Sequence, residues 1–155
     1  MFRDITTLLK DPKALKEVIS RFKNEFENKN ISKVVGIESR GFIFGSILAH
    51  ELGVAFIPAR KPGKLPAPAT REEYELEYGK DAIEIHNDAI EKGDNILIVD
   101  DLVATAGTML AAAKLVEKLG GRVAGIAYVI DLPELKGKEK LKDYNVFNLI
   151  EFEGG

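Results

Sequence analysis

Apolar and polar residues along the chain form blocks that predict a succession of strands and helices. Short runs of consecutive apolar residues are typical of strands buried on both faces. Such runs occur at 34–37, 54–58, 96–99 and 123–130, and a last strand is expected at 146–152. Because helical patterns separate several of these runs, we expect an α/β fold: a mostly parallel, twisted sheet with helices on both faces.

Capping and stop signals place the predicted helices between these strands. Asp11-Pro12 precedes apolar residues at helical spacing up to Phe26, and proline is well tolerated in a first helical turn. A second helix is predicted over 42–52, before Gly53. A third is expected to run to Leu119, where two glycines follow.

The segment from Arg60 to Asp81 has a different composition. Four prolines and glycines interrupt its first part, and four glutamates lie in its second part. A loop of about 20 residues inside a compact domain is often a lid or a binding loop. The alternative is a plain excursion that carries a hairpin or a short helix.

Composition narrows the class of protein further. The chain has 155 residues, which predicts one domain over 1–155. Its formal charge of −3 argues against a broad nucleic-acid-binding face, and the absence of cysteine excludes disulfides and thiolate chemistry. Neither a signal peptide nor an apolar run of membrane-spanning length is visible, so we expect a cytoplasmic protein that binds no membrane.

The segment 96–108, ILIVDDLVATAGT, carries the strongest chemical signal. Two acids, Asp100 and Asp101, are expected where a buried strand ends, at the edge of a parallel sheet where ligands bind. The small residues that follow let backbone N–H groups approach an anion at a helix start. An acid pair beside a phosphate cradle suits a phosphorylated sugar; the alternative is a polar turn with a capping threonine.

This segment resembles the donor-binding signature of the type I phosphoribosyltransferases. Further motifs, in the same order, resemble the adenine phosphoribosyltransferase family over nearly the whole chain. They are Phe2-Arg3-Asp4-Ile5, Leu9-Lys10-Asp11-Pro12, Glu38-Ser39-Arg40-Gly41-Phe42, Arg60-Lys61-Pro62-Gly63-Lys64-Leu65-Pro66 and Leu76-Glu77-Tyr78-Gly79. Two departures are visible: Ala106 replaces a usual glycine, and the N-terminal segment that helps form a hood over the base is shortened, so we expect a reduced hood.

The resemblance implies roles for residues that would bind the donor, phosphoribosyl pyrophosphate. Asp100 and Asp101 would hold the ribose hydroxyls and help to place Mg²⁺, mainly through the donor. Ser39 and Arg40 would bind the pyrophosphate. The cradle of the 5-phosphate would comprise Ala104, Thr105, Ala106, Gly107 and Thr108.

The remaining roles belong to the lid and to the base. Lys61 and Lys64 would add positive charge near the departing pyrophosphate. Glu77 would accept or relay a proton from the base and, with Tyr78, would belong to a flexible lid. Phe2 would stack on adenine, and the backbone near Met1 and Arg3 would read its edge.

Together these roles imply an enzyme that converts adenine and phosphoribosyl pyrophosphate to AMP and pyrophosphate. The expected partners are these small molecules and a second copy of the chain, because the Arg60 region of relatives reaches toward a neighbouring subunit. Two alternatives stay open: the same chemistry on hypoxanthine or guanine, and a nucleotide sensor without catalysis. The paired acids and the lid with Glu77 favour the enzyme.

Overall fold

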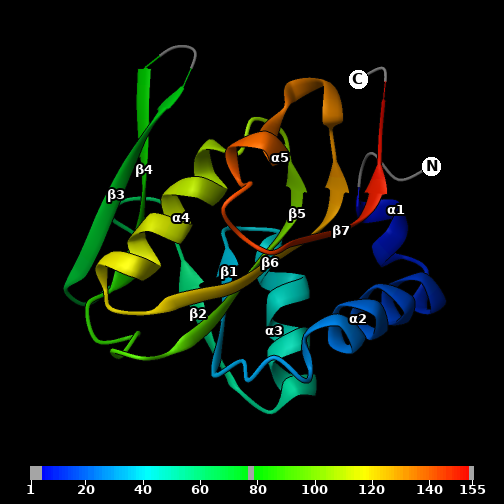
Figure 1. Ribbon diagram of the computed structural model, residues 1–155, viewed down its shortest axis with the longest axis horizontal. Helices are drawn as coiled ribbons and strands as arrows, with labels where there is room; N and C mark the ends of the chain where they lie inside the picture. The colour runs from blue at the N-terminus through cyan, green and yellow to red at the C-terminus, as the bar shows by residue number, and fades with distance from the viewer. Residues whose placement is uncertain (1–4, 77–78, 154–155) are drawn as a thin grey trace.

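A parallel sheet runs through the centre of the molecule. The computed structural model describes residues 5–76 and 79–153 (Figure 1). The sheet has the strand order β2-β1-β5-β6-β7, and each neighbouring pair is parallel. Its strands are β1 (Lys33–Ile37), β2 (Ala55–Ala59), β5 (Asn95–Val103), β6 (Arg122–Asp131) and β7 (Val146–Glu151). The predicted strands and their parallel arrangement are confirmed.

Helices cover both faces of this sheet, as predicted. Alternate residues of β5 point to opposite sides: Ile96 and Ile98 join one buried cluster, and Leu97 and Val99 join the other. The first cluster contains residues of α4 (Gly107–Lys118), and the second contains residues of α1 (Ile5–Leu9), α2 (Pro12–Phe26) and α3 (Gly41–Leu52). The short helix α1 was not predicted.

The predicted boundaries of the long helices are supported by their caps. The Asp11 carboxylate accepts hydrogen bonds from the backbone N–H groups of Lys13 and Ala14, at 3.0 and 3.3 Å, which fixes the start of α2. Gly53 ends α3 in the left-handed conformation that glycine adopts without strain. Local chemistry therefore defines these boundaries without help from the tertiary fold.

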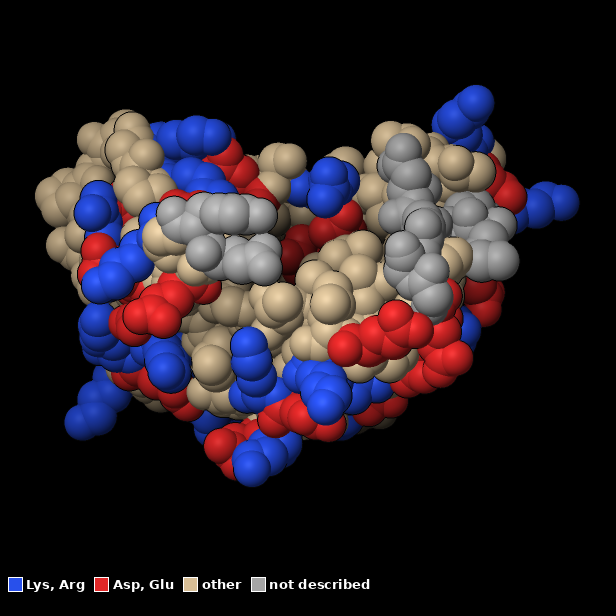
Figure 2. Space-filling view, turned by 90° about the horizontal axis from the view of Figure 1, so that it is seen from above, with Lys and Arg blue, Asp and Glu red and all other residues tan. Residues whose placement is uncertain are grey.

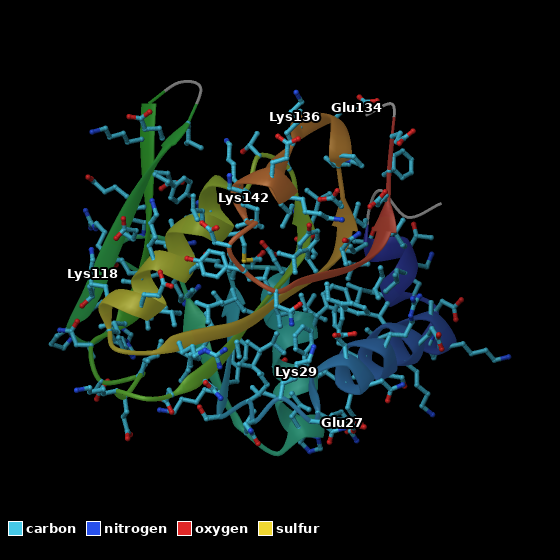
Figure 3. The ribbon with its side chains drawn as sticks, viewed as in Figure 1. Glu27, Lys29, Lys118, Glu134, Lys136 and Lys142 are labelled. Atoms are coloured by element: carbon cyan, nitrogen blue, oxygen red, sulfur yellow. The ribbon has the colours of Figure 1, made fainter. Side chains whose placement is uncertain are left out.

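The segment after β2 forms a hairpin that stands beside α4 (Figure 1). Its strands β3 (Ala69–Leu76) and β4 (Gly79–His86) pair antiparallel in a separate two-stranded sheet. At its lower end, Lys118 at the end of α4 lies beside β3, and its ammonium is 2.8 Å from the Glu72 carboxylate (Figure 3). The segment thus contains the hairpin that was considered as an alternative, and the favoured interpretation as a lid or binding loop stays a prediction.

A short connection between β6 and β7 completes the fold. It contains a 3-10 turn, η1 (Pro133–Leu135), and the short helix α5 (Gly137–Lys140), neither of which was predicted. No helix within residues 5–76 and 79–153 is long and apolar enough to cross a membrane.

Candidate active site

The two adjacent carboxylates lie within β5, which does not end at them as predicted. β5 continues to Val103 because β6 is long enough to pair with it past the acids, through Leu102↔Ile130 and Val103↔Asp131. The backbone of the acid pair is therefore held by the sheet, which fixes the positions of both side chains.

The start of α3 packs against this part of β5. A Cβ on Gly41 would lie 2.7 Å from the backbone carbonyl oxygen of Val99 and 3.1 Å from Oδ1 of Asp100, so only glycine permits the approach. The close packing brings Arg40 to the acids, and its Nε lies 2.5 Å from Oδ2 of Asp101. Asp101 is buried, so this charge-assisted hydrogen bond balances a carboxylate that has little water around it.

Asp100 is the more perturbed of the two acids. Burial, and then the adjacent charge of Asp101, hold the pKa of Asp100 well above its ordinary value. Its Oδ1 accepts a hydrogen bond from the backbone N–H of Asp101 at 2.8 Å. A carboxyl group held in this way, beside a cavity, is typical of a functional site.

The loop after β5 turns sharply into α4. Ala106 is its pivot, with φ 71° and ψ 9°, in the left-handed region that glycine occupies more easily. Helix α4 then begins at Gly107, so Gly107 and Thr108 belong to its first turn, whereas the prediction placed them in the loop. Residues 104–108 line a cavity of about 160 Å³ together with Asp100.

Two helix N-termini therefore point toward the acid pair. Among the described residues, no side chain caps the start of α3 or of α4. The first N–H groups of a helix lack partners within the helix, and the helix dipole favours an anion there. The start of α4 can therefore hold a phosphate group, whereas at the start of α3 the N–H groups of Phe42 and Ile43 already donate to the carbonyl oxygens of Ser39 and Arg40, at 3.1 and 3.2 Å.

Glu38 organises the cations that face this edge of the sheet. Its Oε1 accepts hydrogen bonds from Arg60 Nε at 3.2 Å and from the backbone N–H of Lys61 at 2.9 Å, and its Oε2 accepts one from the Lys64 ammonium. Burial alone would raise the pKa of Glu38, but these hydrogen bonds outweigh it and lower the pKa below the ordinary value.

Lys61 is held by the hairpin from the other side. Its ammonium donates to the hydroxyl of Tyr74 at 2.6 Å and to Oδ2 of Asp81 at 2.7 Å. Tyr74 and Asp81 are directly opposite each other in the β3–β4 pair. Burial acts to lower the pKa of Lys61, but Asp81 and Tyr74 raise it, so the side chain stays charged.

These groups meet around a second cavity of about 290 Å³. Figure 2 looks down on this edge and shows a hollow with acidic side chains at its floor and basic side chains beside it. Of the predicted residues, the cavity is lined by Ser39, Arg40, Lys61, Asp100, Asp101 and Thr108. Lys64 joins the same network through Glu38. Phe2, Arg3, Glu77 and Tyr78 lie outside the described residues.

Glu38, Tyr74 and Asp81 belong to this network although no role was predicted for them from the sequence. The sequence does contain an indication for Glu38. It is a single acid directly before Ser39-Arg40, and three cations (Arg60, Lys61 and Lys64) follow the next predicted strand, so an ion pair between them could have been expected. Tyr74 and Asp81 carried no such signal, because their meeting depends on the register of a hairpin.

The fold and the site have the features expected of a domain that binds a phosphorylated sugar at the carboxyl edge of a parallel sheet. The family model described as the phosphoribosyl transferase domain matches residues 4–155. The adenine phosphoribosyltransferase of Desulfosudis oleivorans is 56% identical over 154 residues, which cover 99% of this chain and 89% of that protein. The chain belongs to the adenine phosphoribosyltransferase family.

Solved structures agree with this assignment. The crystal structure of the Rhodothermus marinus adenine phosphoribosyltransferase matches with a TM-score of 0.94 and 48% identity, over 98% of this chain and 87% of that chain. The Saccharomyces cerevisiae enzyme matches with a TM-score of 0.89 and 42% identity, over 95% and 85%. The latter was crystallised with adenine and an iminoaltritol bisphosphate.

Proposed function

We propose that this chain transfers a phosphoribosyl group from phosphoribosyl pyrophosphate to adenine, releasing AMP and pyrophosphate. The observation that carries the proposal is the pair Asp100 and Asp101 between two uncapped helix N-termini. The carboxylates accept hydrogen bonds from the ribose hydroxyls, the start of α4 binds the 5-phosphate end of the donor, and the Ser39-Arg40 turn before α3 binds the pyrophosphate end. The bisphosphate bound by the yeast relative carries phosphate at two positions, as the donor does.

The donor lies across the edge of the sheet in this proposal. Its 5-phosphate occupies the cavity of residues 104–108, and its pyrophosphate lies by Ser39 and Arg40, with Lys61 on the far wall. A ring nitrogen of adenine forms a bond to the anomeric carbon as the bond to pyrophosphate breaks. Arg40 and Lys61 stabilise the charge that develops on the leaving group. Glu77 takes the proton that the base loses.

Mg²⁺ fits this site as an ion carried mainly by the donor. Three carboxylates (Glu38, Asp81 and Asp101) pair with the four cations around the cavity, so the protein supplies little net positive charge for a donor with several negative charges. Within the described residues, no group of three or more acids or histidines forms a metal cage. Asp100 and Asp101 would hold the ion through the donor hydroxyls and water, and the bound ion would neutralise pyrophosphate oxygens.

The remaining predictions complete the proposal. Phe2 stacks on adenine, the backbone near Met1 and Arg3 reads the edge of the base, and Tyr78 joins Glu77 in the lid. The hairpin side of the site closes over the donor, since water competes with adenine as a nucleophile. The enzyme acts as a homodimer in the cytoplasm.

The decisive experiment removes the charges of the acid pair. The double variant Asp100→Asn, Asp101→Asn keeps the volume of both side chains, and we expect it to fold. Its turnover should fall by at least about a hundredfold, because each lost hydrogen bond to a charged acceptor costs about 1.5–3 kcal/mol. Steady-state assays with adenine, Mg²⁺ and donor measure the effect. Near-normal turnover of the folded variant would overturn the proposal.

A further inference from the structure

The first residue of α5 packs directly against the loop that follows β5. Gly137 is buried, and a Cβ at this position would lie 2.3 Å from the carbonyl oxygen of Ala104 and 2.9 Å from Cγ1 of Val103. Real Cβ atoms essentially never lie within 3.0 Å of such atoms. Only glycine therefore allows α5 to lie this close to the loop.

Contacts on both sides of Gly137 hold α5 in place. Before it, the backbone N–H of Leu132 donates to the carbonyl oxygen of Val103 at 3.2 Å, which extends the β5–β6 pairing by one step. After it, Leu141 is fully buried in the same apolar cluster as Val103 and Ala106. Lys136 turns the chain into α5 with φ 58°, and it points away from the body of the molecule (Figure 3).

We propose that Gly137 is a positioning residue for the 5-phosphate of the donor, acting through Ala104. The carbonyl of Ala104 begins the turn whose pivot is the strained Ala106. If this carbonyl moves, the backbone of residues 105–108 shifts, and these residues line the cavity with Asp100. The inference rests on the proposed function, because that function places the 5-phosphate in this cavity.

The test compares two glycine variants with the same steric overlap. Gly137→Ala sets a methyl group against the Ala104 carbonyl. Gly125→Ala sets one 2.3 Å from Cε1 of Phe26, which belongs to the other apolar cluster, on the side of α2. Calorimetric titration with ribose 5-phosphate measures binding at the phosphate loop independently of turnover, and steady-state assays give the KM of each substrate. Thermal melts check that each variant is folded.

We expect Gly137→Ala to raise the Kd for ribose 5-phosphate and the KM for the donor by at least about tenfold, as for the loss of one hydrogen bond to a charged group. The KM for adenine should change by less than about twofold, since the base contacts lie elsewhere. Gly125→Ala should lower the melting temperature and leave the affinity for ribose 5-phosphate unchanged.

Three results would overturn the inference. Equal ribose 5-phosphate affinity in the wild type and Gly137→Ala would mean that α5 shifts to relieve the overlap and that the loop keeps its position. An equal loss in Gly125→Ala would mean that general destabilisation is the cause. Failure of the wild type to bind ribose 5-phosphate would overturn the proposed function as well.

A second variant covers the case in which Gly137→Ala does not fold. Leu141→Val shortens the apolar anchor of α5 without any overlap with the loop. It should weaken ribose 5-phosphate binding by about threefold, in keeping with partial loss of one contact. An unchanged affinity in this variant would overturn the inference.

Discussion

The backbone conformation of Ala106 shapes the proposed phosphate loop and also affects the free energy of unfolding. A left-handed conformation costs an L-residue about 1–2 kcal/mol. Ala106 is nevertheless buried, so its methyl group contributes packing in the cluster that contains Met109 and Leu141. The position therefore accepts alanine because a conformational cost and a packing gain are of similar size.

Two substitutions at Ala106 separate these effects. Ala106→Gly relieves the backbone cost but loses a methyl group worth about 0.8 kcal/mol and adds freedom to the unfolded chain worth about 0.4–1 kcal/mol. We expect the free energy of unfolding to change by less than about 1 kcal/mol. Ala106→Val should lose about 2 kcal/mol or more, because a β-branched residue fits this conformation poorly. Urea denaturation measures both, and a valine variant as stable as the wild type would contradict the account.

Glu38 gives a second prediction, which depends on pH. Its folded-state pKa lies below the ordinary value of 4.5, so its stabilising contribution is present above about pH 4.5 and is lost as the pH falls through the lowered pKa. At pH 7, Glu38→Gln should lose about 1 kcal/mol, a low value because Arg60 and Lys64 are partly exposed to water.

Denaturation curves at pH 7 and pH 3.5 measure this difference. The gap in unfolding free energy between the wild type and Glu38→Gln should shrink at the lower pH, which lies below the ordinary pKa of 4.5, because the carboxyl group of the unfolded wild-type chain then binds a proton. Glu17→Gln, at an exposed position of α2, is the matched control and should show no such convergence. A gap that is constant with pH would mean that the charge of Glu38 contributes nothing.

At the scale of elements, the sequence was most informative where local chemistry decides the structure. The apolar runs identified all five strands of the sheet, and Asp11 and Gly53 marked helix boundaries that the structure confirms. The end of β5 was predicted wrongly at the acid pair. Two carboxylates lower the apparent strand propensity, but pairing with β6 overrides it.

The hairpin is the element for which we predict movement. Trypsin has two exposed sites on it, after Arg71 and after Lys80. If the hairpin side of the site closes over the donor, addition of phosphoribosyl pyrophosphate and Mg²⁺ should slow cleavage at both by at least about threefold. Mass spectrometry of timed digests measures the rates.

Two controls make the digestion specific. Cleavage at Lys13 and Lys16 on α2 should not change, because this helix lies on the opposite face of the sheet from the hairpin. The variant Asp100→Asn, Asp101→Asn should show no protection. Unchanged cleavage of the wild type at saturating donor would mean that the hairpin is a static excursion.

At the scale of the whole molecule, the site is assembled from segments far apart in sequence. Residues 38–40, 60–64 and 100–108 meet because three parallel strands end at one edge of the sheet. This meeting could be expected from the sequence without knowing the strand order, because the carboxyl ends of all strands in a parallel sheet lie at the same edge. The pairing of Lys61 with Asp81 was beyond reach of the sequence, because it depends on where the hairpin turns back.

The choice of base is a property of the complete molecule, and we predict adenine over hypoxanthine and guanine. The proposed stacking on Phe2 would be worth about 1–3 kcal/mol but would not distinguish one purine from another. Discrimination must come from the edge of the base, where adenine has an amino donor beside an unprotonated ring nitrogen. Hypoxanthine has a carbonyl and a protonated nitrogen there. A backbone carbonyl that accepts from adenine would then face another carbonyl, and a backbone N–H that donates to adenine would face another N–H.

Each buried mismatch of this kind costs about 1–3 kcal/mol, so two of them give a preference of at least about thirtyfold. Parallel measurements of kcat/KM for the three bases provide the test, and equal or better use of hypoxanthine or guanine would rule out adenine specificity. In the same assays, Phe2→Ala should raise the KM for adenine by about tenfold, the worth of one stacked ring, and should leave the KM for the donor within about twofold. The opposite split would mean that Phe2 serves the donor site, and that the base is recognised by another part of the chain.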